Sequence, residues 1–463
     1  MLTYSFENIG KTPLYEHLYR CIRDDILAGR LAPGEKLPSK RALARNLGLS
    51  TITVEGAYDQ LTAEGYCYAL PKRGFFVTET LIEWQTPCVP QPLKTPKPEP
   101  KPWKWRVDFT ANAVRAEDFP FTIWTRLLRQ VVSDASGDLM KRSPSGGVFE
   151  LREAIAEHLR SFRGLAVTPE QIVVGAGTEY LYSLLVKFLG RDKRFCVENP
   201  GYDRVKKVYA SNGAVCVSAG MDAQGVLLDE VEKQQTDILH ISPSHHFPTG
   251  IIMPVSRRYE LLSWANRSPH RRIIEDDYDS EFRMTGRPIP TLMSIDASGR
   301  VIYMNTFSKS LTPTIRISYM VLPMDMVRPF HEKVGFYSCT VSNFEQYTLA
   351  RFIKGGYFEK HINRMRNIYR HRRETLLEHL RTPENAKRLS IIERGSGLHF
   401  LVRFHTEKSD EDIMRRLEAK GIHMRPLSVY YEGDHPAAHH VFVLNYSSLD
   451  VSVLDKDLFS GIV

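Results

Sequence analysis

Two apolar runs in the chain each lead into a charged side chain, and the two charges could serve one reaction. Asp276 ends the run that begins at Ile273, and Lys309 lies shortly after the run Val301–Met304. A lysine amine can form a Schiff base with an aldehyde, and a carboxylate can hold a ring nitrogen protonated, so that the ring acts as an electron sink. Pyridoxal phosphate chemistry needs both groups, so the pair predicts a site for that cofactor.

Further residues could supply a phosphate site. Gly177 and Thr178 follow the apolar segment Ile172–Val174 and open a helical stretch. The free N–H groups and the positive dipole end of such a helix suit a phosphate. Ser308 and Arg316 lie near the lysine in the chain and could complete the phosphate cup, with Arg316 as a fixed charge.

Two tyrosines could contact the cofactor ring. Tyr278 stands beside Asp276 at the end of an apolar strand, where ligands bind in open α/β sheets, and Tyr202 could stack on the ring. Each residue taken alone has an ordinary structural explanation, and the prediction of a cofactor site depends on their combination.

Short apolar runs alternate with helical patterns from about residue 105 onward. The runs include Ile172–Val174, Asp237–Ile241, Ile273–Glu275 and Val301–Met304, and the helical patterns include Glu150–Phe162, Tyr180–Leu189 and the long Phe358–Arg381. This alternation is typical of α/β proteins and predicts a mostly parallel sheet flanked by helices. Residues 388–463 predict a smaller α+β subdomain with strands at Leu398–Phe404 and Val441–Tyr446.

The first 80 residues have helical periodicity followed by a strand-like pair. Apolar residues recur every fourth position over 13–28, which marks one helix face. Ser39 and Ser50 could cap helices at Lys40–Leu47 and Thr51–Gly65, which Gly48 separates, and such a pair predicts a helix-turn-helix. Residues 66–79 alternate around a Pro-Lys-Arg-Gly turn and predict a β-hairpin wing with its cations at the tip.

A proline-rich stretch separates these regions. Residues 81–104 carry seven prolines between Pro87 and Pro102, a composition that favours extended polyproline II. At ~3.1 Å per residue the stretch could reach roughly 75 Å. We expect a helix-turn-helix domain at 1–80, a linker at 81–104 and a larger domain at 105–463. The linker could be a semi-rigid spacer or a floppy connection.

Composition indicates an ordinary globular protein of two or more domains. Of the 463 residues, 42% are apolar and 25% are charged. The sequence has no apolar stretch long enough for a membrane span and no signal-peptide pattern, so we expect a cytoplasmic protein without a membrane partner. The six cysteines form no C-x-x-C pair, and we expect neither disulfides nor a metal site.

Three motifs lie near the helix boundaries of the first 80 residues. They are Leu37-Pro38-Ser39-Lys40-Arg41, Leu49-Ser50-x-x-Thr53-Val54 and Leu61-x-x-x-Gly65-Tyr66. Their spacing resembles the GntR family of winged helix-turn-helix domains, which implies binding to double-stranded DNA with the second helix in the major groove. The implied DNA contacts are Lys40, Arg41, Ser50, Thr51, Thr53, Lys72 and Arg73.

The net charge of +8 fits a DNA partner. The attraction of phosphates, however, depends on cations that cluster on one surface rather than on the net charge of the whole chain. Many family members have arginine where this chain has Thr51 and Glu55, so the operator sequence cannot be inferred from the resemblance. The alternative is an accessory helical domain that contacts only protein.

The rest of the chain carries a longer series of motifs. They are Phe119-Pro120, Gly146-x-x-x-x-Leu151-Arg152, Gly175–Glu179, Glu198–Tyr202, Ser242–Gly250, Glu275–Phe282 and Thr306–Arg316. Residues 105–460 thereby resemble the fold-type I aminotransferases, and with the head the chain resembles the MocR group of GntR-type regulators. By position, the resemblance implies that Lys309 carries the Schiff base and that Asp276 pairs with the pyridine nitrogen. It implies that Tyr278 forms a hydrogen bond with the ring oxygen and that Tyr202 stacks on the ring. It also implies that Ser308, Arg316 and the amides of Gly177 and Thr178 hold the phosphate.

Two departures from this resemblance bear on function. Many transaminases have Asn-Pro-x-Gly where this chain has Phe247-Pro248-Thr249-Gly250, so one contact to the ring oxygen is missing. They also place an arginine on a late strand to clamp the substrate carboxylate, and Val443 occupies the best-matching position. A bidentate clamp contributes positioning and affinity, so ordinary turnover of amino acids is not expected.

Other residues could bind an effector instead. Arg204 could reach the effector pocket, and Arg403 or Arg425 could replace the missing clamp. His399 either lines the same pocket or is a satisfied core histidine.

Together these patterns predict a DNA-binding transcriptional regulator that holds pyridoxal phosphate and senses an amino compound or the cofactor itself. The resemblance implies a homodimer that presents two heads to two half-sites. The alternative function is a working aminotransferase with a DNA-binding head. A regulator that has lost the cofactor is a third hypothesis, and Lys309, Asp276 and Tyr278 argue against it.

Overall fold

The computed structural model describes residues 2–6, 12–79, 105–111, 113–283, 289–395, 397–455 and 458–462. Its contacts divide the chain into two compact units, Met1–Pro102 and Trp103–Val463, which we name the head and the body. The expected linker at 81–104 lies outside the described residues. Within the described ranges no helix is both long and apolar enough to span a membrane. The five cysteines that lie in these ranges are free thiols.

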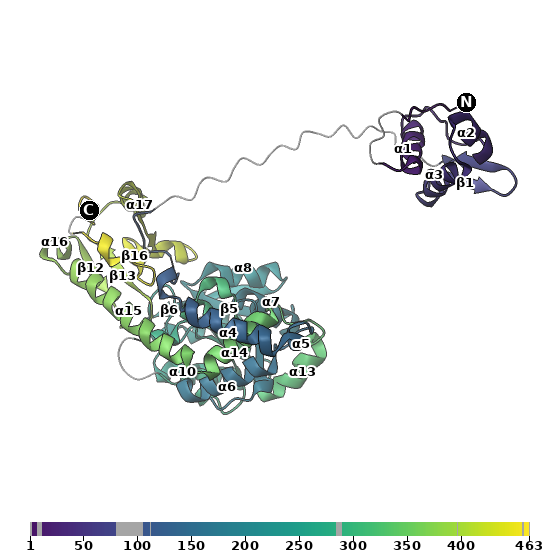
Figure 1. Ribbon diagram of the computed structural model, residues 1–463. Helices are drawn as coiled ribbons and strands as arrows, with labels where there is room; N and C mark the ends of the chain where they lie inside the picture. Colours follow the sequence, from purple (N-terminus) through teal and green to yellow (C-terminus); the bar gives the residue numbers. More distant parts are fainter. Residues whose placement is uncertain are drawn as a thin grey trace. The chain divides into compact units, whose positions relative to one another are not determined.

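The head consists of three helices and a two-stranded hairpin (Figure 1). Its elements are α1 (Leu14–Leu27), α2 (Lys40–Leu47), α3 (Thr51–Ala63), β1 (Cys67–Leu70) and β2 (Gly74–Val77). Leu18, Leu43, Val54 and Leu61 meet in one core. The predicted winged helix-turn-helix is confirmed, and α3 ends two residues before the predicted boundary because its last turn tightens toward Gly65.

Local chemistry explains where the helices of the head begin and end. The side chains of Ser39 and Ser50 accept hydrogen bonds from the backbone N–H groups of Ala42 and Thr53, which satisfies free donors at the starts of α2 and α3. Gly48 ends α2 at a φ of +66°, a conformation that glycine adopts without steric cost.

The body is built on an eight-stranded sheet of order β4-β11-β10-β9-β8-β5-β6-β7. The strands are β4 (Ile172–Gly175), β5 (Arg194–Asn199), β6 (Val215–Asp222), β7 (Gly225–Val226), β8 (Ile238–Ile241), β9 (Arg272–Asp276), β10 (Val301–Thr306) and β11 (Ser318–Val321). The five strands from β10 to β6 are parallel. Strands β11 and β7 are antiparallel to their neighbours, so the predicted mostly parallel sheet is confirmed as a mixed one.

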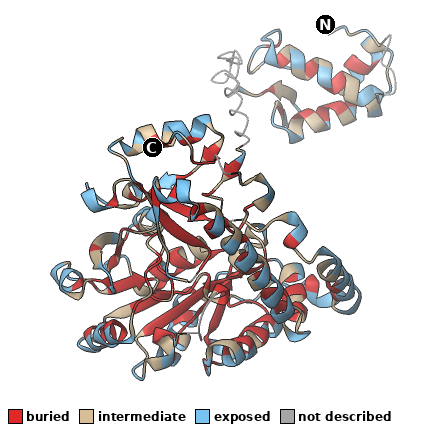
Figure 2. Ribbon diagram, turned by 90° about the vertical axis from the view of Figure 1, so that its left-hand side faces the viewer, coloured by how far each residue is buried: buried red, intermediate tan, exposed pale blue. Residues whose placement is uncertain are grey.

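Helices cover both faces of this sheet, which Figure 2 shows as a buried layer. They are α4 (Phe121–Asp134), α5 (Ser136–Leu139), α6 (Phe149–Arg163), α7 (Thr178–Leu189), α8 (Asp203–Ser211), α9 (Leu228–Lys233), α10 (Val255–Asn266), α11 (Leu292–Ile295), α12 (Phe307–Ser310), α13 (Met324–Val334) and α14 (Asn343–Lys354). Successive side chains of β10 point to opposite faces. Ile302 packs in the cluster of α7 and α13, whereas Tyr303 packs in the cluster of α6 and α14.

A second, smaller lobe follows the long helix α15 (Tyr357–Leu380), which runs from the large lobe toward it (Figure 1). The remaining elements are β3 (Val107–Asp108), α16 (Pro383–Ala386), β12 (Leu389–Ile392), β13 (His399–Phe404), α17 (Asp410–Ala419), β14 (Ile422–His423), β15 (Arg425–Pro426) and β16 (Val441–Asn445). Four of these strands form an antiparallel sheet of order β12-β13-β16-β15, as the predicted α+β subdomain requires.

Candidate functional site

One edge of the large sheet opens into a cavity of about 590 Å³. Strand β9 ends there at Asp276, and α12 carries Lys309 there directly after β10. Parallel strands deliver their carboxyl ends to the same edge, which explains why residues far apart in the sequence meet. All eight residues predicted to hold the cofactor line the cavity: Gly177, Thr178, Tyr202, Asp276, Tyr278, Ser308, Lys309 and Arg316.

The two oxygens of the Asp276 carboxylate differ in their hydrogen bonding. Tyr182 donates a hydrogen bond of 2.6 Å to Oδ2, and His240 Nε2 lies 3.6 Å from the same oxygen. Oδ1 is buried without a hydrogen-bond partner among the described residues. Sequence reasoning missed both supporting side chains, although Tyr182 stands one helical turn after Thr178 and therefore on the same face of α7.

Lys309 carries a half-buried amine that lines the cavity. Burial lowers the pKa of Lys309 to about 8, and the nearby carboxylates of Asp279 and Asp276 oppose that shift. An amine with this pKa is partly neutral near physiological pH, which a nucleophile requires. The short helix that carries Lys309 is capped by Thr306, whose side chain accepts a hydrogen bond from the backbone N–H of Ser308.

The start of α7 and the guanidinium of Arg316 form a close anion cradle. Gly177 has a φ of +92°, and a Cβ atom there would lie 2.5 Å from Arg316 Nη2, so only glycine fits. Arg316 itself has a φ of +51°, which is uncommon for a residue with a side chain and is typical of functional sites. Its Nη2 also lies 3.4 Å from a carboxylate oxygen of Glu179.

Tyr278 is half-buried and lies beside a histidine that the sequence patterns did not single out. Its hydroxyl lies 3.2 Å from His245 Nδ1, and the same nitrogen lies 2.8 Å from Asp279 Oδ2. A proton on Nδ1 would be donated to Asp279, which leaves the phenol of Tyr278 free to donate into the cavity. Burial raises the pKa of Tyr278 well above its usual value, so the phenol keeps its proton.

Cationic and aromatic side chains form the outer wall of the cavity. Val443 lines the cavity, and its directly paired neighbour on β15 is Arg425, which lines the cavity too. Arg204 also lines it and lies 3.6 Å from Glu179. Arg403 instead donates to the backbone oxygens of His439 and Ala437.

His399 is buried and lies outside the set of described residues that line this cavity. Its Nε2 lies 3.1 Å from the backbone oxygen of Pro248, and its ring centroid lies 4.5 Å from that of His245. This arrangement is that of a hydrogen-bonded core histidine.

In the head, the predicted DNA contacts fall into two groups. Arg41, Thr51, Lys72 and Arg73 are exposed, with Lys72 and Arg73 in the turn of the wing. Lys40 is instead held by an ion pair of 2.7 Å to Glu55. The hydroxyls of Ser50 and Thr53 lie 2.7 Å apart in the N-cap of α3, so both already have partners there.

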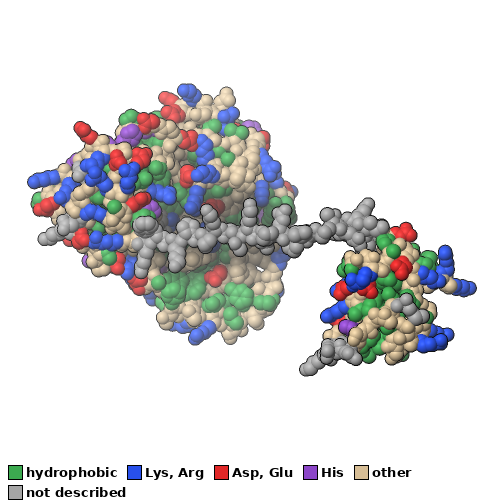
Figure 3. Space-filling view, turned by 90° about the horizontal axis from the view of Figure 1, so that it is seen from above, with side chains coloured by type: hydrophobic (Ala, Val, Ile, Leu, Met, Phe, Trp, Pro, Cys, Tyr) green, Lys and Arg blue, Asp and Glu red, His purple; other side chains and the backbone are tan. Residues whose placement is uncertain are grey.

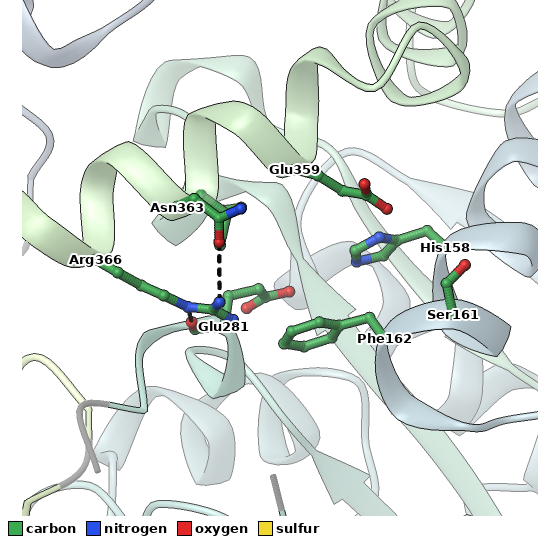
Figure 4. A pocket seen from close by; sticks show the side chains of 8 residues that line it. His158, Ser161, Phe162, Glu281, Glu359, Asn363 and Arg366 are labelled. Atoms are coloured by element: carbon green, nitrogen blue, oxygen red, sulfur yellow. Dashed lines mark hydrogen bonds between the residues drawn. The ribbon is translucent and has the colours of Figure 1, made fainter. Parts of the chain in front are cut away.

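A second, smaller cleft of about 180 Å³ lies between α6 and α15 (Figure 4). Glu281 Oε2 and His158 Nδ1 border it and lack a hydrogen-bond partner within the described part of the chain. Burial raises the pKa of Glu281 to about 7. The other oxygen of Glu281 accepts a hydrogen bond of 3.2 Å from Asn305, so the cleft is linked to strand β10.

Comparisons with known proteins agree with this geometry. Residues 106–438 match the family model of aminotransferase class I and II, and residues 14–77 match that of the bacterial regulatory proteins of the gntR family. The chain is 37% identical to an uncharacterized HTH-type transcriptional regulator, YdeL, of Bacillus subtilis, covering 97% of this chain and 95% of YdeL. It is 32% identical to the probable rhizopine catabolism regulatory protein MocR of Rhizobium meliloti, covering 97% and 93%.

Among solved structures, the kynurenine aminotransferase of Pyrococcus horikoshii superposes with a TM-score of 0.65 at 25% identity. The match covers 77% of this chain and 88% of that enzyme.

Proposed function

The chain belongs to the MocR-type transcriptional regulators, in which a gntR-family head precedes an aminotransferase class I and II body, and we propose that an amino compound regulates it through the cavity around Lys309. The full-length relatives are named as regulators, which favours this function over that of a working aminotransferase. The observation that carries the proposal is that one cavity contains the half-buried amine of Lys309 and a buried oxygen of Asp276 that has no hydrogen-bond partner among the described residues.

Pyridoxal phosphate is the cofactor of this fold, and the residues of the cavity fit it. The aldehyde of the bound cofactor condenses with primary amines, and its ring withdraws electrons from the product. Lys309 is the amine that would hold the aldehyde, and Asp276 Oδ1 is an acceptor with no other partner among the described residues. Tyr278 would donate to the ring oxygen, and Tyr202 would cover the ring. The amides of Gly177 and Thr178, with Ser308 and Arg316, would hold the phosphate.

The outer wall suits an effector that carries a carboxylate as well as an amine. Val443 on β16 occupies the position at which many aminotransferases have an arginine. Arg425, its paired neighbour on the adjacent strand, supplies a guanidinium to the cavity instead. Arg204 offers a second cation on the opposite lobe. An effector can bias the body only through its differential affinity for two conformations, and contacts to both lobes provide such a difference.

A second copy of the chain would give two heads for two half-sites of an operator. Large apolar side chains are exposed at Phe121, Val132, Met140 and Phe149, on or next to α4, α5 and α6. Figure 3 shows hydrophobic side chains gathered on one side of the body. Exposed apolar area of this kind supports pairing of two bodies.

In the head, Arg41, Lys72 and Arg73 would contact phosphates, with Ser50, Thr51 and Thr53 at the start of the recognition helix and Lys40 behind it. From such a DNA partner we infer that the protein acts in the cytoplasm.

The experiment is to load the full-length protein with pyridoxal phosphate and to measure its affinity for operator DNA while amino acids are added. Matched amines without a carboxylate serve as controls. We expect an amino acid to change the DNA affinity of the wild type and to leave that of Lys309→Ala unchanged. Multiple turnovers of amino group transfer from glutamate, together with a DNA affinity that no effector changes, would instead support the aminotransferase.

A further inference from the structure

Ile52 is exposed at an unusual place for an apolar side chain. It is 80% exposed, the largest fraction for any large apolar side chain in the described part of the chain. Scattered apolar residues are normal on protein surfaces and need no explanation by themselves. Ile52, however, is the second residue of α3, directly after the N-cap Ser50 and Thr51. On the opposite face of α3, Val54 and Tyr58 are fully buried against the rest of the head.

The location of Ile52 is the part of the head that meets the bases. In a helix-turn-helix, the N-terminal residues of the second helix contact base edges in the major groove. This step depends on the DNA-binding function of the head. The cations that could hold phosphates, such as Arg41 and Arg73, lie outside α3, so they position the helix without reading the sequence.

The chemistry of α3 limits what it can recognise. Its first two turns, Thr51–Tyr58, contain no arginine, lysine, asparagine or glutamine. Those are the side chains that read guanine and adenine by paired hydrogen bonds in the major groove. Isoleucine has no donor or acceptor and discriminates only by apolar contact. The C5-methyl group of thymine is the apolar group that the major groove presents.

The neighbouring acid strengthens this preference for a neutral, apolar contact. Glu55 lies on the next turn of α3, and Lys40 holds it at 2.7 Å, with Asp59 at 3.7 Å from the same ammonium. The Lys40 ammonium also lies 5.2 Å from the centre of the Phe75 ring. The ion pair offsets part of the negative charge at this turn of α3, and it occupies the ammonium of Lys40 within the head.

We propose that Ile52 is a specificity-determining residue that reads the 5-methyl group of a thymine in each half-site. One methyl group transferred into apolar contact contributes about 0.8 kcal/mol, which corresponds to roughly a fourfold change in affinity. A conservative change that keeps a branched apolar side chain, Ile52→Val, retains most of the preference. Ile52→Ala removes it.

The test uses full-length protein and duplexes that it selects from a random library. Each thymine of the recovered site is then replaced by deoxyuridine, which lacks only the methyl group. We expect one position per half-site at which the wild type binds thymine roughly fourfold better than uracil, and we expect Ile52→Ala to bind both equally. The salt dependence of Ile52→Ala should match that of the wild type, since the change removes no cation.

Leu27→Ala is the matched control, because Leu27 is also exposed and apolar but ends α1. This control should keep the thymine preference. An Ile52→Ala protein that retains the full preference at every position would overturn the proposal while leaving DNA binding intact. Failure of the wild type to select any duplex would overturn the DNA-binding function as well.

Discussion

Tyr182 donates a hydrogen bond of 2.6 Å to Asp276 Oδ2, while Oδ1 of the same buried carboxylate has no partner among the described side chains and backbone. The phenol fixes the orientation of the carboxylate, and both residues line the cavity. Leaving a buried acceptor unsatisfied costs on the order of 1–3 kcal/mol, so a site that keeps one is prepared for a donor from outside the chain. The protonated ring nitrogen of pyridoxal phosphate is such a donor.

Removal of the Tyr182 hydroxyl should weaken cofactor binding. Hydrogen bonds to charged groups contribute roughly 1.5–3 kcal/mol, so we expect Tyr182→Phe to bind pyridoxal phosphate about tenfold or more weakly. Titration of the cofactor, followed by visible absorbance, measures this affinity. Tyr180→Phe on the same helix is the control and should bind normally. Equal affinities of Tyr182→Phe and the wild type would show that the bond does not orient Asp276.

The pH dependence of cofactor capture should follow Lys309. Its pKa is lowered to about 8 by burial, below the usual lysine value, so the neutral amine becomes the main form above about pH 8. We expect the rate at which apoprotein develops the visible band to rise with pH and to level off above about pH 8. Stopped-flow absorbance from pH 6 to pH 10 measures this profile. A midpoint near the usual lysine pKa would mean that the amine is not desolvated as the structure indicates.

Removal of single cations from the head should change the salt dependence of DNA binding. Each phosphate contact contributes about −0.9 to the slope of log K against log salt. We therefore expect Arg41→Ala and Lys72→Ala each to make the slope shallower by about one. Arg20→Ala should leave it unchanged, because Arg20 lies on α1 in an ion pair with Glu16. Fluorescence anisotropy at several salt concentrations measures the slopes, and unchanged slopes in both variants would assign the DNA face elsewhere.

Glu281 should make the body less stable as the pH rises. The pKa of this buried glutamate is raised from 4.5 to about 7, so the folded protein keeps the proton at a pH where the unfolded chain has lost it. Its contribution is therefore complete below about pH 4.5 and is lost as the pH rises to about 7. The lost free energy of unfolding is about 3 kcal/mol for a shift of this size.

We expect Glu281→Gln to gain stability over the wild type across that interval, measured by urea denaturation at each pH. Glu359→Gln, at the rim of the same cleft, is the control and should follow the wild type. A constant difference between Glu281→Gln and the wild type at all pH values would assign the acid an ordinary, solvated environment.

Sequence patterns predicted the winged head, an α/β body with a mostly parallel sheet, and eight of the residues that line the cavity, because these features depend on local signals. Ser39, Ser50 and Gly48 define two helices within a few residues. Asp276 ends one apolar strand, and Lys309 follows shortly after another. Strand β11 was not predicted, because its pairing with β4 and β10 depends on tertiary contacts rather than on a distinct pattern.

The parts that the sequence could not predict arise from contacts between distant segments. Tyr182 and His240 meet Asp276 from separate elements, and nothing in their immediate neighbours distinguishes them from core residues. The ion pair between Lys40 and Glu55 joins α2 to α3 and alters the expected role of Lys40. The position of Arg425 opposite Val443 depends on strand register, which the printed order of residues does not reveal.

The most direct test of the account is the visible absorbance of the purified full-length protein after addition of pyridoxal phosphate, compared with that of Lys309→Ala. We predict a visible band for the wild type that withstands gel filtration, and no such band for the variant. Lys354→Ala, which removes an ion-paired surface lysine, should behave as the wild type. A wild type that stays colourless, or a Lys309→Ala protein that keeps the band, would contradict the assignment of the cofactor to Lys309.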